Sequence, residues 1–434
     1  MRFLFKVIVL FLIVFTFRVP VFYNSAFVSM ALCAFYYYRF RRRIPFTFFY
    51  HRFCYTILIG TVLVSAFVLL ISLIHGTGLV NGIQKRLWIM QVMLFATVFA
   101  IPLLIEKKES SGFEEVLLII CCAFAIQGVI SFAAYIYPPL SDLLMKLKPE
   151  GLREIDADVA MSNKFRYYNL SGILLVELTA GFGVAFVVFF WMQLRYNHPY
   201  MKGWRKYIIF LFIFLGTVFS GRTGFFGFLF GLMGFVYFSF SRVFKLFRRN
   251  INLIVIFTAL ILFSYYYLLN NRQRQSFNDE IFPFAFEWYY NYKDYGKFEV
   301  SSMEATSLHY FYLSDETLLL GHGVQAYDKH NPYPHSDAGY MNNLIFGGIP
   351  LLLCLITYQC LYTALPLFTA QKNRSREGRI DRLFFLILFV YIFFVEIKAP
   401  ALGTLHIVEV MYIAVGATYV YNSYLQRRQS IQNK

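Results

Sequence analysis

The chain has 434 residues, of which 59% are hydrophobic and 15% charged, and its mean hydropathy is +0.55. Apolar runs of about 20 residues recur along it, which excludes an ordinary soluble protein and a β-barrel, whose strands alternate over about 10 residues. The formal net charge of +16 does not indicate nucleic-acid binding. The basic residues flank the apolar runs, where they set membrane orientation and contact lipid headgroups.

The apolar runs predict an all-α polytopic membrane protein with about 12 transmembrane helices. The predicted spans are 3–17, 20–38, 53–75, 87–105, 116–137, 169–192, 207–220, 224–241, 251–270, 338–366, 383–398 and 404–424. No small-residue cleavage site follows the first run, so we interpret it as a retained span rather than a signal peptide. The six cysteines lie in or beside apolar runs without metal-ligand spacing. We therefore predict no disulfide framework, no metal and no cofactor.

The short connections between spans are basic, which places both termini in the cytoplasm by the positive-inside rule. Two longer loops, 138–168 and 271–337, then face outward. The chain divides on this basis into an N-terminal bundle over 1–270, a large extracytoplasmic loop over 271–337 and a C-terminal bundle over 338–434.

The loop over 271–337 differs in composition from the rest of the chain. It holds ten acidic and five basic residues, four of the eight histidines, and eight tyrosines. Loops of this length are functional or disordered, and the aromatic content argues against disorder. Aromatic rings with polar edges suit the faces of sugars, although a packed cap over the membrane domain would use them too.

The stretch Gly321–Pro350 leads from this polar loop into an apolar run. Asn331-Pro-Tyr-Pro334 predicts a rigid turn, and Ser336 or Asp337 is placed to cap the helix that follows. A helix N-terminus offers free N–H groups that suit a phosphate. His335 is then either a turn residue beside the cap or a functional imidazole.

Cationic residues from distant parts of the chain are predicted at the same outer surface. Arg222 lies in the short turn Ser220-Gly-Arg-Thr-Gly224, Arg166 ends the first outer loop, and Lys398 ends the span 383–398. Such an arginine either snorkels to headgroups or grips a pyrophosphate through its planar guanidinium. Together with His335 these residues predict an outward site for a lipid-linked pyrophosphate.

Two glutamates, Glu177 and Glu409, fall inside predicted spans. An ionisable residue at such a position is a functional candidate unless it pairs with a group on a neighbouring helix.

With these residues in view, the chain resembles the Wzy-type oligosaccharide repeat-unit polymerases and, more distantly, the O-antigen ligases. The resemblance covers the whole topology. The motifs on which it rests are Ser220-Gly-Arg-Thr-Gly224, Gly321-His-Gly323, His335-Ser-Asp and Asn343-Leu-Ile-Phe-Gly-Gly-Ile349. It implies a metal-independent membrane glycosyltransferase of the GT-C type in the bacterial cytoplasmic membrane, acting on its outer face.

The resemblance also implies roles for individual residues. Arg222 matches the family's outer arginine and His335 its loop histidine, whereas no motif surrounds Arg166, and Lys398 corresponds only in position. His335 is expected to act as the base and Asp337 as a reserve base or helix cap. The expected pyrophosphate ligands are Arg222, Arg166 and Lys398, and the expected glycan contacts are Tyr333, His309 and His322.

The implied reaction joins two glycans carried on undecaprenyl pyrophosphate, one as donor and one as acceptor. Membrane lipids surround the protein, and a chain-length regulator and a flippase are candidate partners. Two alternatives stay open: a ligase that transfers finished glycan to a lipid or protein, and a lipid-linked oligosaccharide flippase or exporter. A flippase predicts charges in a central cavity and related halves, whereas most unusual charges here lie at the predicted outer rim.

Overall fold

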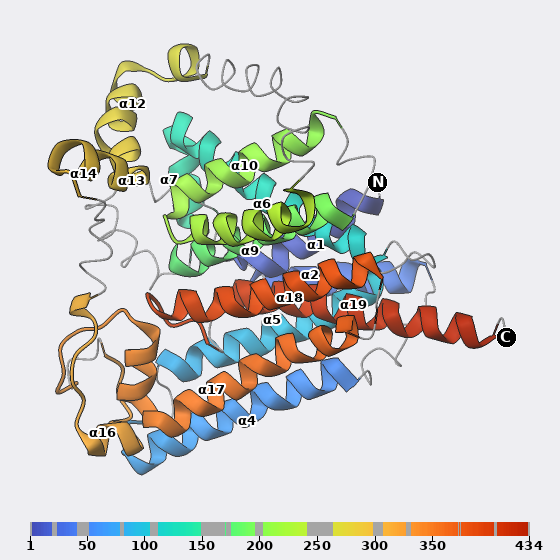
Figure 1. The fold of residues 1–434 in the computed structure, drawn as a ribbon, viewed down its shortest axis with the longest axis vertical. Helices are drawn as coiled ribbons and strands as arrows, with labels where there is room; N and C mark the ends of the chain where they lie inside the picture. The colour runs from blue at the N-terminus through green and yellow to red at the C-terminus, as the bar shows by residue number, and fades with distance from the viewer. Residues whose placement is uncertain are drawn as a thin grey trace. The chain divides into compact units, whose positions relative to one another are not determined.

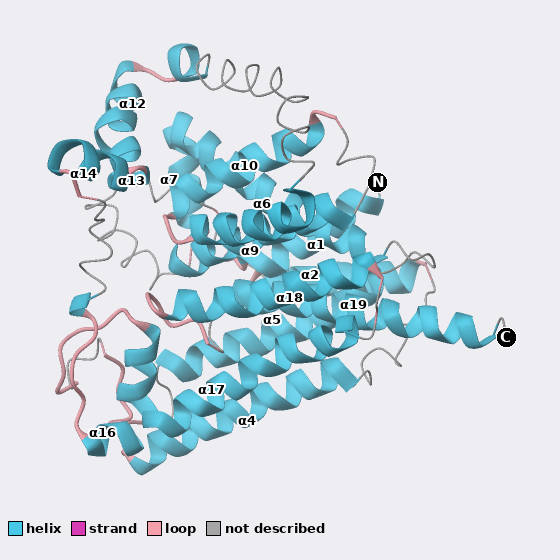
Figure 2. Cartoon of the chain, in the orientation of Figure 1, coloured by secondary structure: helices cyan, strands magenta, loops and turns pink. Residues whose placement is uncertain are grey.

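The computed structural model describes much of the chain as helix. The described residues are 2–19, 24–40, 52–78, 82–104, 112–148, 170, 175–195, 203–240, 264–297, 307–326, 331–371, 373, 375–402 and 406–432. Helices and loops make up all of these ranges, and no strand occurs in them (Figure 2). The predicted all-α class is confirmed for this part of the chain.

The chain forms two compact units, which are described separately. The first comprises Met1–Thr16, Pro20–Ile120 and Ser302–Lys434, and the second comprises Phe17–Val19 and Cys121–Ser301. The loop predicted over 271–337 is thus shared between the two units, with its change of unit after Ser301.

The first unit is a bundle of long helices (Figure 1). α17 packs against α4, α16, α18 and α19, and α5 packs against α4 and α19. Its helices are α1 (Arg2–Phe15), α2 (Ser25–Arg39), α4 (Arg52–Ile74), α5 (Gly82–Leu104), the beginning of α6 (Gly112–Ile136), α16 (Asp315–Leu320), α17 (Gly339–Gln371), α18 (Arg376–Glu396) and α19 (His406–Gln432).

The second unit combines long apolar helices with short polar ones. Its helices are the remainder of α6, α7 (Pro138–Lys146), α9 (Leu175–Arg195), α10 (Arg205–Ser220), the apolar helix Gly224–Phe240, η3 (Ser264–Leu268), α12 (Asn271–Ser276), η4 (Phe277–Ile281), α13 (Phe282–Ala285) and α14 (Glu287–Tyr295). The side chain of Asn270 accepts from the N–H of Gln273 at the start of α12 and completes a capping box.

Five helices in the described ranges are long and apolar enough to cross a membrane. They are Phe53–Ile74, Ile83–Leu104, Gly112–Ile136, Val176–Arg195 and Gly339–Gln371. Helices also occupy most of the described residues in the other predicted spans, apart from 251–270, of which 251–263 lie outside the described residues. The membrane character is therefore supported by five spans, and the count of twelve, the orientation and the outer location of the large loop stay predictions.

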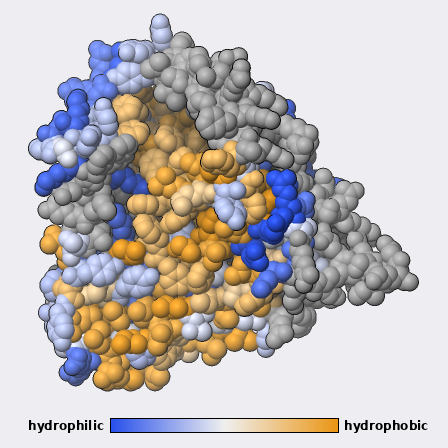
Figure 3. All heavy atoms as spheres, in the orientation of Figure 1, coloured by the Kyte–Doolittle hydropathy of each residue, from blue (hydrophilic) through white to orange (hydrophobic). Residues whose placement is uncertain are grey.

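The outer surface of α4 is apolar, as expected for a helix in contact with lipid. Leu63 and Leu73 are more than 60% exposed, and Val62 and Leu70 are at least half exposed. Figure 3 shows that hydrophobic side chains cover most of the described surface on one face of the molecule. Apolar exposure on this scale would destabilise a soluble protein and is stable against acyl chains.

α17 is broken near its first turns at Gly347 and Gly348, whose backbone angles are not helical. Gly348 has φ +64°, and a Cβ atom there would lie 2.7 Å from the carbonyl oxygen of Leu318. A residue with a side chain would be strained by this angle and would clash with the end of α16. The break divides α17 into a short piece that follows the polar loop and a long piece of membrane-spanning length.

The Gly321-His-Gly323 motif closes this break. The N–H of His322 donates to the carbonyl of Ile345 at 2.7 Å, and the N–H of Gly323 donates to the carbonyl of Phe346 at 2.8 Å. A broken helix leaves carbonyls without their usual partners, and in an apolar environment each would be costly. The motifs Gly321-His-Gly323 and Gly347-Gly348 therefore contact each other, and together they form the joint between the polar loop and α17.

Candidate functional site

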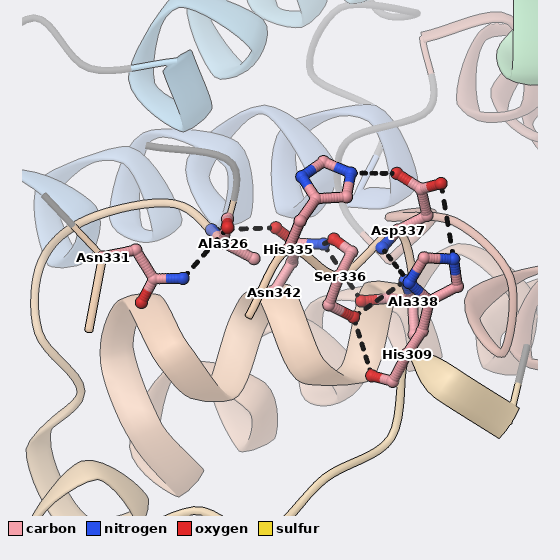
Figure 4. A network of polar contacts seen from close by, with 8 residues as sticks. All are labelled: His309, Ala326, Asn331, His335, Ser336, Asp337, Ala338 and Asn342. Atoms are coloured by element: carbon pink, nitrogen blue, oxygen red, sulfur yellow. Dashed lines mark hydrogen bonds and ion pairs between the residues drawn. The ribbon is translucent and has the colours of Figure 1, made fainter. Parts of the chain in front are cut away.

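Asp337, just before α17, stands between two imidazoles (Figure 4). Nε2 of His335 lies 3.0 Å from Oδ1 of Asp337, and Nε2 of His309 lies 3.6 Å from Oδ2. The two histidine rings have centroids 6.3 Å apart. One carboxylate thus faces two titratable rings, and we call His309, His335 and Asp337 the His335 cluster.

The three side chains differ in how far they reach solvent. The side chains of His335 and Asp337 are 57% and 64% exposed, whereas that of His309 is 23% exposed. His335 is consequently the imidazole that an incoming molecule can reach, and His309 supports the carboxylate from the protein side.

The hydrogen bonds select a tautomer for each neutral ring. The backbone N–H of Asp337 donates to Nδ1 of His309 at 3.2 Å, so the hydrogen of a neutral His309 lies on Nε2, facing Asp337. Nε2 of His335 faces the same carboxylate, so its hydrogen lies there too. In this tautomer the lone pair of the exposed His335 ring lies on Nδ1, the atom through which a neutral imidazole acts as a base.

The backbone around the cluster is fixed by buried polar groups. Ser336 is fully buried, and its hydroxyl donates to the carbonyl of His309 at 2.8 Å and accepts from the N–H of Ala338 at 3.3 Å. The amide of Asn342 donates to the carbonyl of Ser336 at 2.6 Å. Of the two caps predicted for this helix, Ser336 is the one that meets the first N–H groups, and the side chain of Asp337 turns to the histidines instead.

A second polar group lies beside the His335 cluster in the same unit. The hydroxyl of Tyr333 lies 2.7 Å from Thr317 Oγ1 and accepts the N–H of Ser314 at 3.1 Å. Nε2 of His322 lies 2.8 Å from the same Thr317 hydroxyl. The hydrogen bonds with Ser314 and Thr317 lower the pKa of the Tyr333 phenol.

The predicted glycan residues are therefore divided between these two groups. Tyr333 and His322 lie together, with ring centroids 5.7 Å apart, while His309 belongs to the His335 cluster. Phe311 stacks on Tyr333, with centroids 5.9 Å apart and planes 19° apart. Both rings are partly buried and pack against the core formed by Leu313, Ala338 and Ile345, among others, so a glycan contact at Tyr333 stays a prediction.

Arg222 lies in the second unit and is not a lone cation. Its guanidinium donates to the carboxylate of Glu287 at the start of α14, and both side chains are 20% exposed. Burial lowers the pKa of Arg222. No sequence pattern indicates this partner, which is 65 residues away. Because Glu287 already binds the guanidinium, a pyrophosphate at Arg222 would compete with it.

Lys398 follows α18 in the first unit and is partly buried, with its backbone N–H bonded to the carbonyl of Val395. The nearby Glu396 is fully buried. It accepts from the Asn343 amide at 2.7 Å and from the N–H of Leu402 at 2.7 Å. Glu396 therefore joins the end of α18 to the start of α17 and positions the segment that carries Lys398.

The predicted residues fall into separate parts of the structure. His335, Asp337, His309, Tyr333, His322 and Lys398 belong to the first unit, Arg222 belongs to the second, and Arg166 lies outside the described residues. Within the described ranges, no three His, Cys, Asp or Glu side chains are grouped to hold a metal ion. The meeting of Arg222 and His335 at one pyrophosphate stays a prediction.

Comparison with protein-family models, curated proteins and solved structures finds no match for the chain.

Proposed function

We propose that the protein is a membrane glycosyltransferase that polymerises oligosaccharide repeat units carried on undecaprenyl pyrophosphate at the outer face of the bacterial cytoplasmic membrane. The observation that carries this proposal is the His335 cluster. An exposed imidazole, oriented by a carboxylate that a second histidine also contacts, is the arrangement a general base requires.

In the proposed reaction, a hydroxyl of the acceptor glycan attacks the anomeric carbon of the donor. The hydroxyl proton passes to Nδ1 of His335, while the bond from the anomeric carbon to the lipid pyrophosphate breaks and its electrons leave with the phosphate oxygen. Asp337 stabilises the imidazolium that forms. The leaving pyrophosphate requires cations, and Arg222, Arg166 and Lys398 are the proposed sources.

The test is elongation by the purified full-length protein in liposomes, with lipid-linked repeat units as both donor and acceptor. The proposal expects longer lipid-linked glycans without any ion gradient, and loss of this product in Asp337→Asn. Asp294→Asn, which changes an exposed aspartate on α14, is the matched control and should behave as wild type.

The same assay separates the proposal from its alternatives. A ligase would leave the lipid-linked units unextended and transfer glycan only to a different acceptor. A flippase would move the units across the bilayer without lengthening them. Either result would overturn the assignment as a polymerase.

A further inference from the structure

The turn that joins α17 to α18 in the first unit forms a basic pocket. The two helices pack against each other (Figure 1), and the pocket lies where α17 ends and α18 begins. Its volume is about 180 Å³, several times that of a water molecule, so it has room for a larger chemical group. Its lining residues are Ala370, Gln371, Asn373, Gly378, Arg379 and Arg382.

The two arginines are the charged groups that a ligand would meet in this pocket. Arg379 and Arg382 are three residues apart on α18, so they share one face of the helix, and both are exposed. Neither guanidinium has a hydrogen bond or an ion pair with another of the described residues. The acidic residues of the same turns, Glu377 and Asp381, are one or two positions from an arginine and do not face it, and Asp381 is fully buried.

The connection before α18 adds a third donor. The side-chain oxygen of Asn373 accepts the N–H of Ser375 at 3.1 Å, which leaves the amide nitrogen as a donor. Gly378 lets this connection approach the helix, since a Cβ atom there would collide with the carbonyl oxygen of Asn373. The hydroxyl of Ser375 already accepts the N–H of Gly378. The binding groups of the pocket are therefore side chains rather than the open end of a helix.

The face of α18 that carries the arginines becomes apolar farther along the helix. Leu386 and Val390 follow Arg382 at intervals of four residues, which places all three side chains in one row. Leu386 is 45% exposed and Val390 is 44% exposed. A ligand that matches the whole row has a negative charge at one end and hydrocarbon at the other.

We propose that this pocket binds the phosphate group of an anionic phospholipid, whose acyl chains lie along Leu386 and Val390. Arg379, Arg382 and the amide nitrogen of Asn373 are donors, and the oxygens of a phosphodiester are acceptors. Residues 372–382 include five basic and two acidic residues. This positive balance favours a lipid with a net negative charge over a zwitterionic lipid with the same chains.

The lipid site is separate from the His335 cluster. α17 begins beside that cluster and ends at the pocket, and it is one of the five described helices that are long and apolar enough to cross a membrane. The two ends of such a helix lie at opposite membrane surfaces. The inference therefore does not depend on the proposed glycosyltransferase activity.

Native mass spectrometry of the full-length protein in neutral detergent tests the proposal, with phosphatidylglycerol and phosphatidylcholine of identical acyl chains as probes. We expect wild type to bind the first phosphatidylglycerol about tenfold more tightly than the first phosphatidylcholine. Arg379→Gln should remove most of this preference. Arg376→Gln removes the same charge from an exposed arginine of α18 that does not line the pocket. It is the matched control and should keep the preference.

Three results would overturn the proposal. Equal affinities of wild type for the two lipids would do so without any variant, so the test does not depend on whether Arg379→Gln folds. Equal losses of preference in Arg379→Gln and Arg376→Gln would show that overall basic charge, rather than this pocket, attracts the lipid. Excess inorganic phosphate should leave phosphatidylglycerol bound, and its displacement would show that the pocket takes free phosphate instead of a lipid.

Discussion

The His335 cluster and the buried group of Thr61, Tyr358, Tyr362 and Glu409 on α4, α17 and α19 each contain a carboxyl group, but their surroundings are opposite. In the first, a carboxylate that is 64% exposed faces two imidazoles in a polar loop. In the second, the carboxyl of Glu409 is fully buried and interacts electrostatically with the phenols of Tyr358 and Tyr362. Water reaches the first site, whereas a charge at the second would be costly in the low dielectric around it. Environment, rather than residue type, thus distinguishes the two carboxyl groups.

The largest effect expected at the exposed site is that of His335→Ala. Removing a general base lowers the rate by about 10²–10⁴-fold, so elongation of lipid-linked repeat units should fall by that amount while the thermal midpoint stays near that of wild type. If the variant elongates glycans within about twofold of the wild-type rate, His335 is not the general base.

The next effect concerns the joint between the loop and the bundle. Gly348→Ala places a side chain at φ +64° and within 2.7 Å of a carbonyl oxygen, and strain with overpacking of this kind costs about 2–4 kcal/mol. Thermal unfolding in detergent should show a clear loss of stability. Gly296→Ala, with a similar positive φ but open space around it, is the control that isolates the clash and should lose less.

A smaller effect is expected when one hydroxyl is removed from the buried, hydrogen-bonded group of Thr61, Tyr358 and Tyr362. Tyr358→Phe leaves Thr61 and Tyr362 without the hydroxyl that joins them, at a cost of about 1–2 kcal/mol. The exposed counterpart Tyr312→Phe, at a residue that is 82% exposed, should be neutral. Equal thermal midpoints for the two variants would show that burial does not set this cost.

The smallest effect is a pH dependence at Tyr333. Its pKa is lowered in the folded protein, so it contributes stability that is present above the phenol's unfolded pKa of about 10 and is lost as the pH falls through the folded value. The stability difference between wild type and Tyr333→Phe should therefore widen as the pH rises through this range. Urea titrations at several pH values measure this stability difference. If it narrows as the pH rises, the pKa of Tyr333 is not lowered in the folded protein.

Much of the helical structure was predictable, because apolar runs of membrane length leave the backbone few alternatives to helix. Adjacent residues were predictable too: His335 and Asp337 are neighbours in sequence and in space. Contacts between distant segments were not. His309 lies 28 residues from Asp337, and no periodicity connects them. Arg222 stands alone among apolar residues in the sequence, and Glu287, on a short helix of the polar loop, has no sequence relation to it.

The break in α17 illustrates the same limit. Gly347 and Gly348 are visible as a motif, but the apolar run around them predicts one uninterrupted span. What interrupts it is the docking of His322 and Gly323 on the carbonyls of Ile345 and Phe346, a tertiary contact that helix propensity does not contain.

This joint has a mechanical consequence. The short first piece of α17 carries the histidine-bearing loop at its beginning, and two glycines separate that piece from the long membrane-embedded shaft. Hydrogen bonds from His322 and Gly323 hold the two pieces together, so the break sets the direction in which the histidine-bearing loop leaves the long helix.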